Sequence, residues 1–286
     1  MTHRMSPGKA GSVAMSLWER DARVWDKYWV PIFSLFARQL VLVSSPSPGD
    51  VILDVGTGSG LAVRELCERT PSVGLVVGID SSEEMIRLAH RRAASAALKN
   101  VRFLKMLEEE LRFPNDFFDV VISNCGMSES RAGFSQCVKE IIRVLRPGGV
   151  FAFNDWYLID VKPHIIFREI LGRYRTAKPS RQLARERGLA TSSIDEKMQL
   201  HILRETGFKE ASLVKRRHQA CLNSVEDYLK LRLCRSTVRR EMSEMTASNR
   251  RLFLRDLRPA LKQFVSDDGA FRFNWPVYYI RADKPR

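Results

Sequence analysis

The segment VILDVGTGSGLAV, residues 51–63, constrains this chain more than any other feature. A short apolar run leads to Asp54, and glycines then occupy every second position at Gly56, Gly58 and Gly60. Glycine tolerates left-handed backbone conformations and lets another group approach the main chain closely. The residues that follow have helical spacing, and the N-terminus of a helix favours an anionic group. The segment therefore predicts a ligand-binding turn between a strand and a helix.

The spacing of the glycines distinguishes this turn from two common nucleotide-binding loops. A dinucleotide loop needs G-x-G-x-x-G, but the sixth position counted from Gly56 is Leu61. A phosphate-binding P-loop needs Gly-Lys followed by Ser or Thr, and the segment lacks that pair. The pattern is D-x-G-x-G-x-G, and the next apolar run ends on Asp80. A carboxylate there is placed to accept hydrogen bonds from both hydroxyls of a ribose.

Short apolar runs alternate with amphipathic helical segments after residue 50. We expect strands at 51–55, 74–80, 101–105, 119–124 and 150–156, and helices at 60–70, 82–96 and 133–145. The last of these helices should end at the RPGG sequence, because proline and glycine cannot continue it. This alternation is typical of a parallel sheet covered on both faces, with ligands at the carboxyl ends of the strands.

Composition separates a near-neutral region from a basic one. The chain has 286 residues, 44% of them hydrophobic, and a net charge of +14. Residues 161–286 contain 28 Lys and Arg against 14 Asp and Glu, so they account for the whole excess. The charge shift marks a change of structural role, from the glycine-loop region to a basic, helix-rich C-terminal part.

Several classes of protein do not fit the sequence. The longest apolar stretch, YWVPIFSLFARQLVLV, is interrupted by polar residues and is short for a membrane span. The N-terminal residues lack the apolar core of a secretory signal. Five cysteines without a CxxC pair suit neither a disulfide framework nor a zinc site. We therefore expect a cytoplasmic protein without a transmembrane segment or a metal centre.

Four motifs in the same order resemble one family. They are LDVGTGSG, GIDSSEEMI, LEEELRFPNDFFDVVISN and EIIRVLRPGGVFAFND, and they cover roughly residues 50 to 155. The chain resembles the class I S-adenosylmethionine-dependent methyltransferases, particularly the small-molecule branch that includes the ubiquinone and menaquinone biosynthesis enzymes. The resemblance implies an α/β fold with a Rossmann-like, seven-stranded, mostly parallel sheet. Helices would cover both faces, and the last strand would be antiparallel.

The resemblance also implies where S-adenosylmethionine binds. The methionine part would lie on Asp54 and the glycine loop, and the ribose on Asp80. Relatives commonly recognise adenine with an acid of a Gly-Asp-Ala type. Here that position falls among Met106, Leu107 and Glu108, which leaves main-chain groups or Glu108 for this role. The full set of expected cofactor residues is Tyr28, Asp54, Gly56, Thr57, Gly58, Ser59, Gly60, Asp80, Ser81, Met85, Leu107, Glu108 and Asn124.

The family layout extends to the rest of the chain. It predicts N-terminal helices over the cofactor and two helical insertions that cover the acceptor. The expected segments are a tail (1–12), the N-terminal helices (13–48), the cofactor-binding core (49–157), a helical lid (158–193), a core helix and strand six (194–218), a second helical insertion (219–270), and the last strand and tail (271–286).

Methyl transfer requires little catalytic machinery. The sulfonium methyl is already activated, so the acceptor atom must be held in line with water excluded. A general base is needed only if the acceptor arrives protonated. The sequence therefore assigns no single catalytic residue. The candidates are Asn124, Asp155, Tyr157, His164 and His218.

Two other functions remain open from the sequence. The basic C-terminal part suits a tRNA or rRNA methyltransferase, because clustered Lys and Arg bind phosphates. However, the fourth strand ends in SNCG and not in the Asn/Asp-Pro-Pro-Tyr/Phe motif of base amino-group methylases. A protein that binds the cofactor without transferring methyl groups is the second alternative. The sequence favours a small-molecule acceptor and leaves open the acceptor atom (O, N or C) and the oligomeric state, monomer or homodimer.

Overall fold

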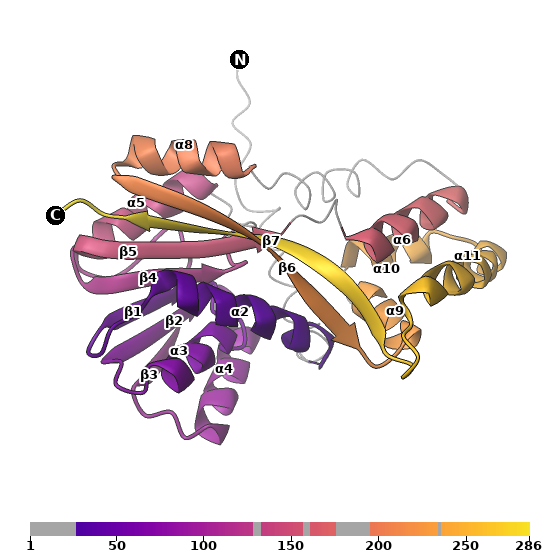
Figure 1. Cartoon of the computed structure of the whole chain (residues 1–286), viewed down its shortest axis with the longest axis horizontal. Helices are drawn as coiled ribbons and strands as arrows, with labels where there is room; N and C mark the ends of the chain where they lie inside the picture. The colour runs from indigo at the N-terminus through magenta and orange to yellow at the C-terminus, as the bar shows by residue number, and fades with distance from the viewer. Residues whose placement is uncertain (1–26, 128–132, 157–160, 176–194, 234–235) are drawn as a thin grey trace, which may run out of the picture.

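The computed structural model consists of a helix-covered sheet and a helical lobe beside it (Figure 1). The structure describes residues 27–127, 133–156, 161–175, 195–233 and 236–286. The expected tail, the first expected helix up to residue 26, and Tyr157 therefore lie outside the described residues.

In the described part of the chain, the sheet has seven strands in the order β3-β2-β1-β4-β5-β7-β6. Neighbours from β3 to β5 pair in parallel, whereas β7 is antiparallel to both β5 and β6. This arrangement confirms the predicted fold, including the antiparallel last strand. The strands are β1 (Val51–Val55), β2 (Leu75–Asp80), β3 (Val101–Lys105), β4 (Phe118–Asn124), β5 (Leu145–Trp156), β6 (Glu210–Leu222) and β7 (Phe271–Asp283).

Helices cover both faces of the sheet, which explains why its central strands are apolar throughout (Figure 1). Helices α2 (Val30–Ser44), α3 (Leu61–Arg69) and α4 (Glu83–Ser95) pack on one face. Helices α5 (Phe134–Val144) and α8 (Glu196–Thr206) pack on the other. The carboxyl ends of β1, β2 and β4 thus meet at one edge, where the predicted ligand site lies.

Strand β5 begins earlier than the sequence predicts. We expected a strand from residue 150, but β5 starts at Leu145, directly after α5. Its pairing with β4 shifts between Phe118 and Val120, so the RPGG sequence forms an irregularity within the strand. Helix α5 does end just before this sequence, as expected. The sequence does not form a loop between the helix and the strand, because it is already part of β5.

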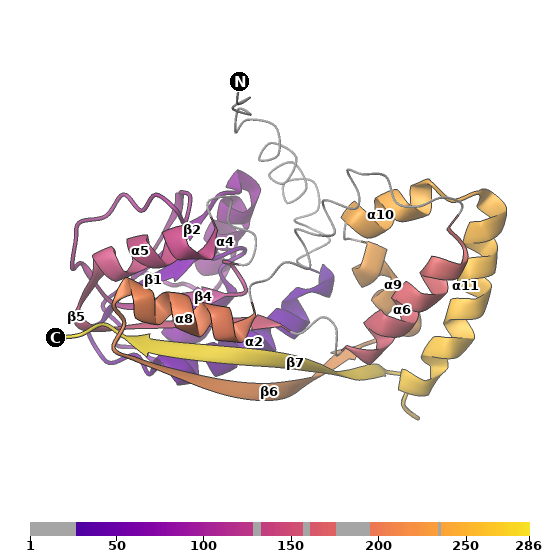
Figure 2. The same ribbon diagram turned by 90° about the horizontal axis from the view of Figure 1, so that it is seen from above.

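Strands β6 and β7 continue beyond the sheet as a two-stranded ribbon that reaches the helical lobe (Figure 2). The last pair between β5 and β7 joins Trp156 and Val277. Among the described strands, residues 271–276 of β7 pair with β6 alone, and Phe271 also forms a bridge with Val265. Strand β6 runs to Leu222, past the boundary expected at residue 218. Pro276 lies on this ribbon, one residue beyond the last β7 residue that pairs with β5. Proline has no N–H to donate, and at this position the sheet loses no bond to β5.

The helical lobe gathers around the far end of the ribbon (Figure 2). It contains α6 (Lys162–Arg173), α9 (Val225–Leu233), α10 (Ser236–Ser243) and α11 (Ala247–Leu261). The rings of Phe167 in α6 and Phe253 in α11 meet edge to face at 5.3 Å. These helices come from the two segments that the sequence suggested as helical insertions.

Trp275 joins the sheet core to the helical lobe. Its ring is fully buried, and it lies 5.7 Å from Trp29, 6.0 Å from Trp156 and 4.9 Å from the ring of His164. These partners belong to the start of α2, the end of β5 and α6. Aromatic contacts of this kind contribute beyond their buried area, so the cluster holds three elements together.

Within the described ranges, no helix combines the length and the apolar character that crossing a bilayer requires.

Replacing Trp275 with alanine should lower the free energy of unfolding by about 3 to 5 kcal/mol, because it empties a large buried site. Urea unfolding measures this loss. Leu42→Ala is the control, since Leu42 lies on α2 with 55% of its surface exposed. Equal losses in the two variants would contradict a joining role for Trp275.

Candidate functional site

Asp54 lies at the centre of the glycine loop. It is fully buried near the end of β1, and its Oδ2 accepts a 2.6 Å hydrogen bond from the Thr57 hydroxyl. The Thr57 amide donates to the carbonyl of Ile79 on β2, at 2.8 Å. The loop is therefore tied to both central strands.

The Asp54 carboxylate has capacity for a further partner. Its Oδ1 is buried and accepts no hydrogen bond within the described structure. Burial raises the pKa of Asp54 to about 7, the Thr57 hydrogen bond lowers it, and the charge of Asp80 raises it further. A buried carboxylate with one bare oxygen fits a cationic group in the ligand.

The loop glycines have different reasons to be glycine. A Cβ on Gly56 would lie 2.7 Å from the Cα of Gly126, so this position needs close packing. Gly58 has a φ of +54°, and a Cβ there would meet nothing within 4 Å. The Gly58 main chain therefore faces open space between the first two strands, as a ligand cradle requires. Gly60 begins α3 with a φ of +80°.

Asp80 meets the same loop from β2. Its Oδ2 accepts from the Gly58 amide at 2.9 Å, and its Oδ1 accepts from the Ser82 amide at 2.8 Å. Burial raises the pKa of Asp80, and these two hydrogen bonds oppose that rise. Ser82 also caps α4 by accepting from the amide of Met85, while Ser81 lies half-buried between Asp80 and the cap. The two predicted acids thus share one loop.

Arg92 is a site residue that the sequence analysis missed. From the last turn of α4, its Nη1 donates to both the carbonyl and the hydroxyl of Ser59, each at 2.6 Å. Ser59 is buried between two glycines with positive φ. The Arg92 guanidinium therefore holds Ser59, the loop residue between these two glycines, in place. The contact spans 33 positions, and no local pattern indicates it.

The end of β4 closes the site on its other side. The Ser123 hydroxyl donates to the Val55 carbonyl at 2.8 Å, which attaches β4 to the glycine loop. Asn124 accepts at Oδ1 from Asn154 of β5, at 3.0 Å. Cys125 follows with a φ of +56°, and its amide donates to Asn154 at 2.8 Å. Two carboxamides thus lie together beside the predicted cofactor loop.

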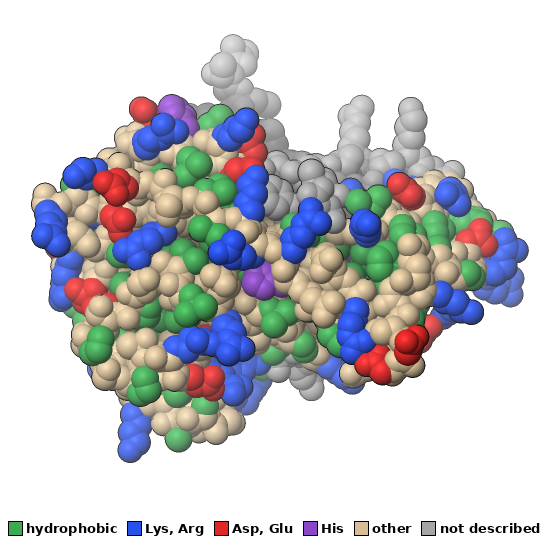
Figure 3. Space-filling view, in the orientation of Figure 1, with side chains coloured by type: hydrophobic (Ala, Val, Ile, Leu, Met, Phe, Trp, Pro, Cys, Tyr) green, Lys and Arg blue, Asp and Glu red, His purple; other side chains and the backbone are tan. Residues whose placement is uncertain are grey.

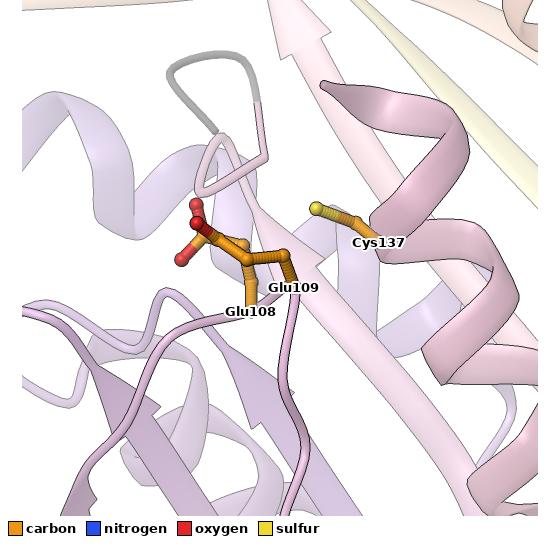
Figure 4. Close-up of side chains that lie close together, drawn as sticks. All are labelled: Glu108, Glu109 and Cys137. Carbon is orange, nitrogen blue, oxygen red and sulfur yellow. The ribbon is translucent and has the colours of Figure 1, made fainter. Parts of the chain in front are cut away.

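The segment after β3 places Glu108 beside α5. A carboxylate oxygen of Glu108, one of Glu109 and the Sγ of Cys137 lie within 4.8 Å of one another (Figure 4). Both carboxylates are half-buried, and the thiol is fully buried on α5. Leu107 is also half-buried, and its carbonyl accepts from the amide of Glu110 at 3.3 Å. The predicted adenine region is therefore a half-buried, partly acidic surface.

The predicted histidines both lie in pairs with tyrosine. His164 is buried in the lobe, with Nδ1 3.2 Å from the Tyr228 hydroxyl. His218 on β6 has Nε2 2.7 Å from the Tyr279 hydroxyl. His164 belongs to α6 and His218 to β6, and neither element forms part of the glycine loop.

Three further predicted residues have clear positions. Asp155 is buried on β5, and its Oδ1 accepts from the amide of Trp156 at 2.8 Å. Met85 is buried on α4. Tyr28 is buried before α2, with the Lys27 ammonium 5.5 Å from its ring centre. The roles expected for Asp155, Met85 and Tyr28 remain predictions.

Comparison with known sequences identifies a domain. A family model described as "Methyltransferase domain" matches residues 46–207. The aklanonic acid methyltransferase of Streptomyces sp. (strain C5) is 32% identical over 106 residues, which are 37% of this chain and 48% of that protein. A demethylmenaquinone methyltransferase of Symbiobacterium thermophilum is 36% identical over 40% of this chain and 45% of that protein. The chain spans about half the length of these curated relatives.

Solved structures share the fold. The YcgJ protein of Bacillus subtilis matches with a TM-score of 0.55 at 18% identity, covering 88% of this chain and 99% of that one. Phosphoethanolamine N-methyltransferase 2 of Haemonchus contortus, solved with S-adenosyl-L-methionine, matches with a TM-score of 0.57 at 17% identity, covering 95% and 60%.

Asp54→Asn should change how stability depends on pH. The folded state holds the Asp54 proton more tightly than the unfolded state, where the pKa is 3.8. The contribution of Asp54 to wild-type stability should therefore fall as the pH rises from about 4 to about 7, and then level off. The uncharged variant should be more stable than wild type by about 1 to 3 kcal/mol above pH 7, and similar to it near pH 4. Urea unfolding across this range tests the sign, and a variant less stable at high pH would contradict it.

Proposed function

Because the chain belongs to the methyltransferase domain family, we propose that it transfers a methyl group from S-adenosylmethionine to a small-molecule acceptor. The proposal rests on two neighbouring features. The buried Oδ1 of Asp54 accepts no hydrogen bond within the described structure, and a Cβ on Gly58 would meet nothing within 4 Å. S-adenosylmethionine carries an ammonium group, a ribose and a sulfonium. A buried carboxylate, a half-buried glycine turn and a second acid suit these groups.

We assign the parts of the cofactor to three strand ends. Asp54 and the loop from Gly56 to Gly60 hold the methionine part. Asp80 and Ser81 hold the ribose, with Met85 below them. Leu107 and Glu108 border the adenine, while Asn124 and Tyr28 border the cofactor from the acceptor side.

The chemistry depends on placement. The bound cofactor supplies an activated methyl group, so the chain's residues need to orient the acceptor and exclude water. Asn124, Asn154 and Asp155 lie at the ends of β4 and β5, and we propose that they orient the polar part of the acceptor. Trp156 is half-buried, and its ring lies 5.0 Å from Phe33. This gives the same end of the site an apolar side.

The relatives' names support a small organic acceptor, since they refer to aklanonic acid and demethylmenaquinone. The distribution of charge also favours this class over nucleic acid. On the face shown in Figure 3, Lys and Arg side chains are spread over the core and the lobe, with acidic side chains among them. Arg258 pairs with Glu226 at 2.8 Å, and Arg272 pairs with Asp268 at 2.6 Å. Arg258 and Arg272 are thus each paired with an acid of the protein itself.

Arg92→Met should weaken binding of S-adenosylhomocysteine about five- to tenfold, because Ser59 loses two charge-assisted hydrogen bonds that order the loop. Calorimetry measures the dissociation constant. Arg91→Met is the matched control: Arg91 is the preceding residue of α4, 61% exposed and 3.9 Å from Glu84. Equal affinities in the two variants would remove Arg92 from the site.

Methyl transfer tests the proposed function directly. The protein is incubated with tritium-labelled S-adenosylmethionine and, separately, with a demethylmenaquinol, phosphoethanolamine, a small-molecule cell extract and bulk tRNA. We expect label in a small-molecule fraction. Gly58→Val should abolish it, because a β-branched side chain is strained at this positive φ and enters the open space. Label in tRNA alone, or in no fraction, would contradict the proposal.

A further inference from the structure

A row of polar side chains crosses the otherwise apolar face of the sheet under α2. Asn124 on β4 is the direct strand partner of Asn154 on β5, and Asn154 is the partner of Tyr279 on β7. Partners in register point to the same face, so the three side chains lie side by side. His218 on β6 extends the row through its contact with Tyr279. We call these four residues the polar row.

The Asn154 carboxamide has a defined orientation within the row. Its oxygen accepts from the Cys125 amide at 2.8 Å, and its Nδ2 donates to Asn124 Oδ1 at 3.0 Å. Asn124 in turn donates through Nδ2 to the Phe33 carbonyl on α2, at 3.4 Å. A flipped Asn154 carboxamide would set donor against donor at Cys125 and acceptor against acceptor at Asn124.

Tyr279 and His218 form the outer half of the row. Burial raises the pKa of Tyr279 and lowers the pKa of His218, so both are neutral near pH 7. The phenol oxygen and Nε2 of the imidazole share a hydrogen bond across 2.7 Å. The Asn154 carboxamide lowers the pKa of Tyr279, as a donor facing the phenol oxygen does. Asn154 and Tyr279 are thus neighbours in strand register, and Tyr279 shares a hydrogen bond with His218.

The fold itself does not need this hydroxyl. Tyr279 is fully buried in the apolar cluster, and the ring of Phe36 lies 5.3 Å from that of His218. A phenylalanine at 279 would fill the same space without burying a hydroxyl, which is costly unless it is bonded. The polar pair therefore serves the carboxamides next to it.

We propose that Tyr279 and His218 are positioning residues that hold the carboxamides of Asn154 and Asn124 in the orientation they present at the acceptor end of the site. The inference rests on the proposed function, in which these two asparagines orient the acceptor. The proposal thus gives β7 and β6, at one edge of the sheet, a role in a site centred on β1 and β4.

Side-chain amide signals of the full chain, labelled with ¹⁵N-asparagine, test this proposal. Asn154→Ser and Asn124→Ser assign the signals. Tyr279→Phe and His218→Leu should shift and broaden the Asn154 and Asn124 signals, whereas His218→Gln, which retains an acceptor for the phenol, should preserve them. Tyr228→Phe is the matched control, because it removes a buried hydroxyl from the other tyrosine–histidine pair, in the lobe.

The two tyrosine variants should have similar thermal stability, but only Tyr279→Phe should change the asparagine signals. Unchanged Asn124 signals in Tyr279→Phe would overturn the positioning role. Adding S-adenosylhomocysteine to the wild type separates the two proposals. If it leaves the Asn124 signals unmoved, the cofactor placement is wrong, and the positioning role falls with it.

Discussion

The close packing of Gly56 against Gly126 sets the geometry of the site. A Cβ on Gly126 would lie 2.6 Å from the Val55 carbonyl, and one on Gly56 would lie 2.7 Å from the Gly126 Cα. The loops after β1 and β4 therefore touch main chain to main chain. This contact buries Asp54 on one side and brings Asn124 close on the other. A side chain at either glycine would separate the first-strand loop from the fourth-strand residues.

The sequence predicted what local patterns determine. The strand-helix alternation and the D-x-G-x-G-x-G spacing placed Asp54 and Asp80 at neighbouring strand ends. In the structure, Asp54 bonds Thr57 and Asp80 bonds the next loop residue, Gly58. Arg92 was missed because α4 carries several arginines, and only the packing of α4 on the loop selects one of them. Tyr279 was missed because its role depends on strand order. The start of β5 was wrong because a helix stop does not show where a strand resumes.

The helical lobe explains the uneven charge of the chain. Its basic excess does not form a separate tail but covers helices whose inner sides are aromatic, such as those of Phe167 and Phe253. Long basic side chains keep their charge in water while their stems cover apolar surface. Less exposed arginines have specific partners: the half-buried Arg175 pairs with Glu241, and the buried Arg232 lies 5.0 Å from the ring of Phe167. The lobe thus extends the apolar core that lies under α2 and carries basic side chains on its exterior.

The position of β7 between β5 and β6 has a consequence for the order of folding. During synthesis, β6 emerges before β7, yet its only strand partner in the described sheet is β7. Until residues 271–283 are made, β6 is a long strand with both edges unpaired, and such strands are prone to join other chains. Lys215, Arg216 and Arg217 lie in its middle and repel a second copy of the same strand. The basic run in β6 therefore disfavours pairing with a second copy of this strand, in the nascent chain as at the edge of the finished sheet.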